Sequence, residues 1–115
     1  MAQSVCIPFR LLPGKGAAAR AFMEELERGR FDDYAKSQDR IGATLEHWFI
    51  GEIEGAEYLI GFIHYRDFKA AVRIFAASQD PFDAWFKACC LDCTGIDFNN
   101  PPAMALPVLV SEFPR

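Results

Sequence analysis

The chain has 115 residues, of which 51% are hydrophobic and 24% charged, as expected for one globular domain spanning residues 1–115. Its net charge is −4 and its Lys and Arg residues do not cluster, which argues against a nucleic-acid partner. No apolar run approaches the roughly 20 residues that span a bilayer. The first residues lack an export signal, so we expect no membrane association and a cytoplasmic location.

The first part of the chain predicts a strand and two helices. Apolar residues alternate from Ser4 to Leu11 and predict a strand, in which Pro8 marks an edge or a bulge. An apolar stripe at helical spacing predicts a helix from Ala17 to Arg28. A second helical pattern runs from Phe31 to Ile41, and Gly42 is placed to end it.

A β-hairpin from Thr44 to Tyr65 occupies the centre of the chain. Both arms are rich in β-branched and aromatic residues, and Glu54-Gly55 offers a two-residue turn. That turn pairs Ile53 with Ala56, Glu52 with Glu57, Gly51 with Tyr58, Trp48 with Gly61, His47 with Phe62 and Leu45 with His64. We favour it on the known preferences of hairpin turns, and the aromatic rings of Trp48 and Tyr58 would then cover glycines. A three-residue turn would separate the opposed glutamates and move the two histidines to opposite faces.

The last part of the chain predicts two more helices and a strand. Asp67 is placed to cap a helix that begins at Phe68. Asp80-Pro81-Phe82-Asp83 begins another, which ends at Gly95. Residues Leu106 to Phe113 predict the last strand. The order β-α-β-β-α-β, with both helical crossovers doubled, predicts an α+β fold of the ferredoxin-like sandwich type.

Both faces of the predicted sheet are apolar. Phe49, Ile60 and Phe62 alternate with the inward set that contains Trp48 and Leu59. A sheet covered by helices on one side only alternates apolar with polar residues. We therefore expect the second face to pack against another sheet, that of a second copy of this chain in a homodimer.

Several segments resemble an uncharacterised bacterial family of the dimeric α/β-barrel proteins: Ile7-Pro8, Leu12-Pro13-Gly14-Lys15, Glu46-His47-Trp48-Phe49 and, most specifically, Ala76 to Lys87. The resemblance covers most of the chain. It implies a ferredoxin-like protomer that pairs sheet to sheet into a homodimeric α/β barrel. The wider superfamily includes cofactor-free monooxygenases, haem-degrading enzymes, muconolactone-isomerase-like enzymes and stress-responsive proteins. None of their catalytic motifs is matched, so the resemblance implies no activity.

The two histidines, His47 and His64, are the candidate catalytic residues. The favoured register makes them diagonal neighbours on one face of the hairpin. Paired neutral imidazoles could take a proton from a phenol or an enolisable ketone. The commoner alternative is that the histidines are structural or lie at a pocket edge. A metal site is the least favoured, because no third ligand stands at a typical spacing.

Tyr34, Trp48, Tyr65 and Trp85 are candidate walls of a substrate pocket between sheet and helices. The alternative is that they are ordinary core residues, since aromatic residues at helical spacing are usually buried. We expect no cofactor, because the chain has neither a phosphate-binding glycine loop nor a nucleophile elbow.

The four cysteines are Cys6, Cys89, Cys90 and Cys93. We expect reduced thiols, since three of them crowd into five residues. The pair Cys90 and Cys93 falls at the end of a predicted helix, where the helix dipole opposes a thiolate. A redox role is therefore ranked last.

Two functions lead. The first is a homodimer that binds a small aromatic or enolisable ligand, or acts as a cofactor-free monooxygenase or isomerase. The alternative is a non-catalytic homodimeric module for stress response or interaction.

Overall fold

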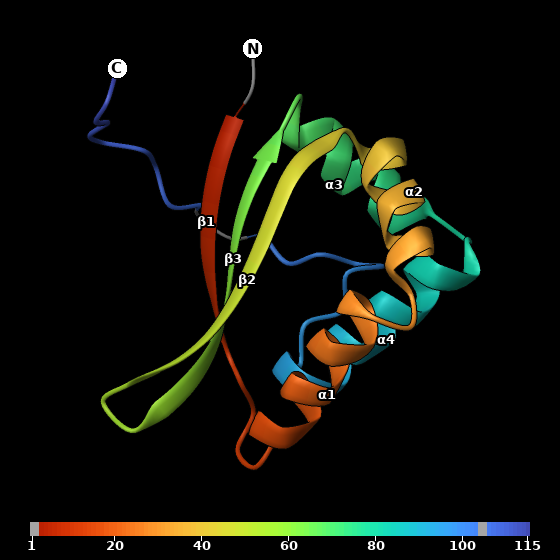
Figure 1. Ribbon diagram of the computed structural model, residues 1–115, viewed down its shortest axis with the longest axis vertical. Coiled ribbons are helices and arrows are strands. Elements are labelled where there is room, and N and C mark those ends of the chain that lie inside the picture. The colour runs from red at the N-terminus through yellow and green to blue at the C-terminus, as the bar shows by residue number, and fades with distance from the viewer. Residues whose placement is uncertain (1–2, 104–105) are drawn as a thin grey trace.

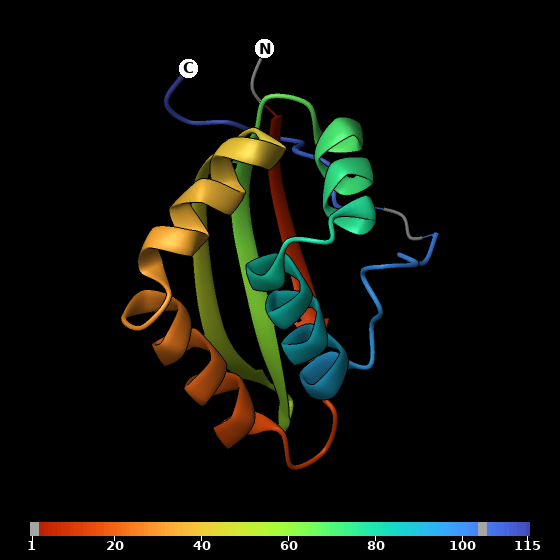
Figure 2. The same cartoon turned by 90° about the vertical axis from the view of Figure 1, so that its right-hand side faces the viewer.

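The computed structural model describes residues 3–103 and 106–115. Over these residues it contains four helices and one antiparallel sheet of three strands. The elements are β1 (Gln3–Arg10), α1 (Gly16–Glu27), α2 (Phe31–Ile41), β2 (Ala43–Ile53), β3 (Ala56–Tyr65), α3 (Phe68–Ala77) and α4 (Pro81–Thr94). The helices form a layer over one face of the sheet, and the other face is left uncovered by them (Figures 1 and 2). The α+β class is confirmed.

The predicted hairpin register is confirmed. The strand order is β1-β3-β2, and β2 pairs with β3 through a two-residue turn at Glu54 and Gly55. Both turn residues have positive φ, 49° and 79°, which gives the turn a twist that matches the strands. Trp48 covers Gly61: a Cβ added there would lie 2.7 Å from Cζ3 of the indole. Gly51 is paired with Tyr58 as predicted, but the nearest side-chain atom to a Cβ there belongs to Ile60, so the tyrosine ring does not cover it.

The predicted helix ends are also confirmed. Asp67 accepts a hydrogen bond from the backbone N–H of Ala70 at the start of α3, and Asp80 accepts from those of Phe82 and Asp83 at the start of α4. The C-caps of α2 and α4, Gly42 and Gly95, have φ of 76° and 78°. The left-handed conformation favours glycine there and satisfies the last carbonyls of each helix.

A buried polar cluster joins α2 to the loop between α3 and α4. Asp83 is 1% exposed, and its carboxylate accepts hydrogen bonds from the hydroxyls of Ser37 and Ser78. Arg40 donates to the same carboxylate at 3.1 Å and also pairs with Asp80 at 3.0 Å. A buried carboxylate needs such partners, because burial without them is costly. This cluster therefore fixes the position of α2 against α4.

Lys87 has a related structural role. Its side chain is 2% exposed, and its ammonium donates to the carbonyl oxygens of Phe75, Ala76 and Ser78. A cation satisfies carbonyls that have no partner within the helix. The segment from Ala76 to Lys87, which carries the most specific part of the resemblance, thus forms the joint between α3 and α4.

The predicted last strand, Leu106–Phe113, is wrong. Residues 106–115 have no regular secondary structure, and the chain passes the β1 side of the sheet to end beyond its uncovered face (Figure 1). Val110 and Phe113 are 91% and 97% exposed. A strand needs a partner ladder, and Pro107 in the segment and Pro8 in β1 each lack a backbone N–H. The ferredoxin-like order is therefore incomplete within the described residues.

No helix in the described parts of the chain is both long and apolar enough to cross a lipid bilayer.

Candidate functional site

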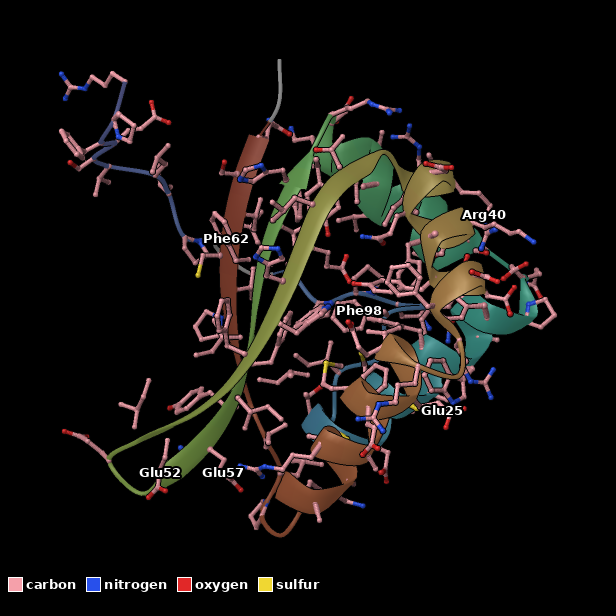
Figure 3. All side chains as sticks on the ribbon, viewed as in Figure 1. Glu25, Arg40, Glu52, Glu57, Phe62 and Phe98 are labelled. Atoms are coloured by element: carbon pink, nitrogen blue, oxygen red, sulfur yellow. The ribbon has the colours of Figure 1, made fainter. Side chains whose placement is uncertain are left out.

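A cavity of about 300 Å³ lies between the inner face of the sheet and the helix layer. Its walls are mostly apolar and come from all three strands, from α2, α3 and α4, and from the segment after α4. Phe98 from that segment lies between sheet and helices (Figure 3) and packs edge-on against Phe9 at 5.8 Å between ring centroids. Thr94, Ser37 and Gln38 add a few polar atoms.

Glu46 is the one charged side chain among the described residues that line this cavity. It lies on β2 opposite Ile63, on the face that the helices cover. Its Oε1 atom accepts hydrogen bonds from the Tyr34 hydroxyl and the Trp48 indole Nε1, both at 2.7 Å. Its Oε2 atom accepts from the Gln38 amide Nε2 at 3.0 Å. The carboxylate is therefore held in one orientation by donors from α2 and from its own strand.

The electrostatics of the site follow from burial. Burial raises the pKa of Glu46, although the hydrogen bonds from Tyr34, Trp48 and Gln38 act in the opposite direction. Burial also raises the pKa of Tyr34, and the neighbouring Glu46 charge and hydrogen bond add to it. The pKa of Tyr65 is raised by burial and then by the same charge. Both tyrosines are thus kept as neutral hydroxyls beside a carboxyl whose charged form is disfavoured.

A second, open depression lies on the other side of this cluster, between α1 and the edge strand β2. Tyr34, Glu46 and Trp48 line both it and the cavity. Glu27 and His47 are among the residues at its rim. The Tyr34–Glu46–Trp48 cluster therefore forms the partition between the internal cavity and the open surface.

Three of the four aromatic residues proposed as pocket walls, Tyr34, Trp48 and Tyr65, line the cavity. Trp85 is not among its lining residues. Its ring is half-buried and packs against Phe22 with 5.4 Å between ring centroids. The guanidinium of Arg30 lies 4.2 Å from the centre of the Trp85 ring, a cation–π contact that covers the ring.

The two histidines share a face, as the register predicted, but that face is the one away from the helices. His64 pairs with Leu45, and its ring contacts Phe62 edge-on at 5.2 Å between ring centroids. Phe62 lies on the side of the sheet opposite Phe98 (Figure 3). Neither histidine lines the cavity, although His47 shares the open depression at the β2 edge with Glu46. An acid–base role for His47 and His64 stays a prediction about the outer face.

The thiols near the site are unfavourably placed for ionisation. Cys90 lines the cavity and is buried, and Cys93 is buried nearby in the last turns of α4. Burial is the main cause that raises the pKa of each. No group of three or more His, Cys, Asp or Glu side chains within residues 3–103 and 106–115 could hold a metal ion.

Sequence reasoning missed Glu46 and Gln38 as site residues. A signal for Glu46 was present: the period-two pattern puts it on the same strand face as Trp48 and Ile50, where a charged residue is out of place. Gln38 follows Tyr34 by one helical turn, so both point from α2 toward the same carboxylate.

Comparison with curated proteins gave no match, and neither did comparison with solved structures. A family profile does match, over residues 2–112, which is nearly the whole chain. The prediction that the chain belongs to an uncharacterised family is thereby confirmed at that level. The chain is a member of the family described as "Family of unknown function (DUF6176)".

Proposed function

We propose that this protein binds a small, uncharged and largely apolar molecule in the cavity, and that Glu46 exchanges a proton with it. The observation that carries the proposal is a carboxylate, held by three hydrogen bonds, that faces a cavity otherwise lined by uncharged residues. Ligand sites in proteins commonly combine apolar walls with a few fixed polar groups. The volume of about 300 Å³ is at the small end of such sites.

The hydrogen bonding at Glu46 leaves room for one ligand contact. A carboxylate has about four acceptor positions. Oε1 uses two of them for Tyr34 and Trp48, and Oε2 uses one for Gln38. No donor from the described residues takes the remaining position on Oε2, so it is available to a donor on the ligand. A carboxyl whose pKa is raised by burial is also better suited to acid–base work near neutral pH than an exposed one.

The binding step can be tested by isothermal titration calorimetry at neutral pH. The probes are 2-naphthol, which is uncharged and carries a hydroxyl donor, and 2-naphthoate, which has a similar size but is anionic. We expect saturable binding of 2-naphthol and binding at least about tenfold weaker of 2-naphthoate, because the described lining residues include no cation to offset Glu46.

A cavity-filling variant gives the matched control. Ala71 is buried on α3 and lines the cavity, whereas Ala77 at the end of the same helix is exposed. We expect Ala71→Leu to abolish 2-naphthol binding and Ala77→Leu to retain it. Absence of binding to the wild-type protein, or equal binding to both alanine variants, contradicts the proposal.

We further propose that the protein is a homodimer that pairs through the uncovered sheet face, and this also supports the alternative of a non-catalytic interaction module. Phe49 is 55% exposed on that face, and Phe62 lies two strand positions along from the β3 partner of Phe49. Large exposed apolar patches commonly mark interaction sites. Sedimentation at micromolar concentration should show a dimer that Phe49→Glu weakens and Ile74→Glu, on exposed α3 surface, leaves intact. A wild-type monomer contradicts this.

A further inference from the structure

Like Glu46, Tyr65 is a polar residue that lines the cavity from a strand of the sheet. It is the last residue of β3 and is 9% exposed. A bulge at Thr44 pairs it with Ala43 in place of the threonine. Ala43 is itself buried, so the bulge turns a small side chain inward beside the tyrosine ring. Phe68 packs edge-on against that ring at 5.3 Å between centroids.

The Tyr65 hydroxyl has an unused hydrogen-bonding capacity. Within the residues that the structure describes, no hydrogen bond involves it, whereas the Tyr34 hydroxyl donates to Glu46. The same part of the chain has one fully enclosed side-chain polar atom without a partner, Nε of Arg30. The Tyr65 hydroxyl is therefore not sealed in the core, although its residue is nine-tenths buried and lines the cavity. A hydroxyl that reaches accessible space can donate to a ligand that enters it.

Tyr65 and Glu46 are near neighbours on the inner face of the sheet. Glu46 is opposite Ile63, and Tyr65 follows Ile63 by two residues on the same face of β3. Such diagonal neighbours lie within reach of long and aromatic side chains. The Glu46 charge contributes to the raised pKa of Tyr65, as expected for groups this close. The cavity wall thus contains a residue with a carboxylate acceptor and, diagonally across the strands, one with a hydroxyl donor.

We infer that the cavity takes an uncharged ketone with acidic hydrogens beside its carbonyl, and that Tyr65 donates a hydrogen bond to the carbonyl oxygen while Glu46 takes the adjacent proton. This inference rests on the proposed function of the cavity. It narrows the ligand from any apolar molecule to one that carries an acceptor oxygen and an enolisable carbon. It also assigns to Tyr65 the hydrogen bond to the carbonyl oxygen, which its apolar neighbours cannot donate.

The proton-transfer step balances without a cofactor. The Glu46 carboxylate removes the proton from the carbon beside the carbonyl, and the C–H electron pair becomes the carbon–carbon double bond of an enolate. The carbonyl π electrons move to the oxygen, where the Tyr65 hydroxyl stabilises the charge by hydrogen bonding. Glu46 then returns the proton to the oxygen, to the same carbon or to a conjugated carbon. Return to the same carbon regenerates the ketone with its hydrogen exchanged, return to the oxygen gives the enol, and return to a conjugated carbon gives a double-bond isomer.

The test uses 2-tetralone as the enolisable ketone and tetralin as its hydrocarbon analogue. Deuterium incorporation into 2-tetralone in D₂O is followed by mass spectrometry, and binding of both probes is measured by calorimetry. The variants are Glu46→Gln, Tyr65→Phe and Tyr58→Phe. Tyr58 is the matched control, because it pairs with Gly51 at the far end of the hairpin and does not line the cavity.

We expect the wild-type protein to accelerate deuterium exchange and to bind 2-tetralone more tightly than tetralin. Glu46→Gln should bind the ketone but lose exchange by about 100-fold or more, the usual contribution of a general base. Tyr65→Phe should lower exchange by about 100-fold or more and remove the preference for ketone over hydrocarbon. Tyr58→Phe should match the wild type.

The outcomes separate this inference from the proposed function. If neither tetralin nor 2-tetralone binds, the cavity is not a ligand site and both fail. If both bind equally to the wild type, or if Tyr65→Phe matches Tyr58→Phe in exchange, the Tyr65 inference is overturned while the cavity remains a binding site. The wild-type comparison of ketone with hydrocarbon decides the matter even if Tyr65→Phe does not fold.

Discussion

Replacing Gly61 by alanine tests the contact on which the carboxylate cluster depends. The added Cβ would lie 2.7 Å from Cζ3 and 2.9 Å from Cη2 of the Trp48 ring. Carbon atoms in contact are separated by about 3.5–4.0 Å, so the indole must move by about 1 Å. Since Trp48 donates to Glu46 at 2.7 Å, the same movement stretches that hydrogen bond.

The expected loss of stability combines two contributions. Overpacking costs about 1–3 kcal/mol, and a hydrogen bond to a charged group contributes about 1.5–3 kcal/mol. Tilting of the ring preserves part of the bond, so we expect Gly61→Ala to lower the free energy of unfolding by about 2–4 kcal/mol. Gly51 is the control: a Cβ there would lie 4.0 Å from the nearest side-chain atom. Gly51→Ala should change stability by less than about 0.5 kcal/mol.

Urea unfolding followed by circular dichroism measures both variants. Indole fluorescence in a Trp85→Phe background then reports the environment of Trp48 alone, since the chain has two tryptophans. Unfolding of Gly61→Ala and Gly51→Ala at the same urea concentration, with unchanged Trp48 emission, would contradict this prediction. In that case Trp48 does not lie over Gly61, and its hydrogen bond to Glu46 is not formed as described.

Two further predictions concern α4 and are measured by the same urea unfolding. Asp83→Ala should lower the free energy of unfolding by about 2–4 kcal/mol, because it leaves buried donors such as the Ser37 hydroxyl unsatisfied. Asp80→Ala should lower it by about 1 kcal/mol through loss of the helix cap. Equal losses would mean that Asp83 is not a buried acceptor. Trp85→Ala should lower the free energy of unfolding by about 2–3 kcal/mol, less than loss of a fully buried tryptophan would, because its ring is only half-buried beneath Arg30. An unchanged urea midpoint would show that the ring contributes no packing energy.

The hairpin could be predicted from sequence because all the information is local. Few turn lengths are possible at Glu54 and Gly55, and each turn length fixes which residues of β2 and β3 are paired. The caps at Asp67 and Asp80 were predictable for the same reason, since each residue contacts backbone within its own first turn. Where an interaction spans only a few residues, pattern and structure agree.

The predictions that failed or were incomplete depend on distant partners. The apolar pattern after Leu106 satisfies strand propensity, but it cannot supply a neighbouring edge with free hydrogen-bonding groups. The role of Glu46 depends on donors from α2, which follow from tertiary packing and not from the strand itself. Trp48 and Trp85 look alike in sequence, yet Trp48 faces the cavity and Trp85 lies beneath Arg30. Composition and spacing do not distinguish such cases.

The raised pKa of Glu46 makes a prediction about stability and pH. An acid with a higher pKa in the folded state than in the unfolded state binds protons more readily when folded. Its contribution to stability is therefore fully present below the unfolded value of about 4.3 and is lost as the pH rises through the folded pKa. The side chain in Glu46→Gln cannot titrate. The free energy of unfolding of this variant should therefore rise relative to that of the wild type as the pH increases over this range.

Urea unfolding from about pH 4.5 to pH 8 spans the relevant window. Subtracting the Glu46→Gln curve from the wild-type curve cancels the titration of other groups. Glu54→Gln, at the exposed turn, serves as the control and should give a nearly constant difference. If the difference between wild type and Glu46→Gln is constant, or grows in favour of the wild type as the pH rises, hydrogen bonds from Tyr34, Trp48 and Gln38 outweigh burial. The carboxyl would then be an ordinary buried anion, too weakly basic for the proton transfer that we propose.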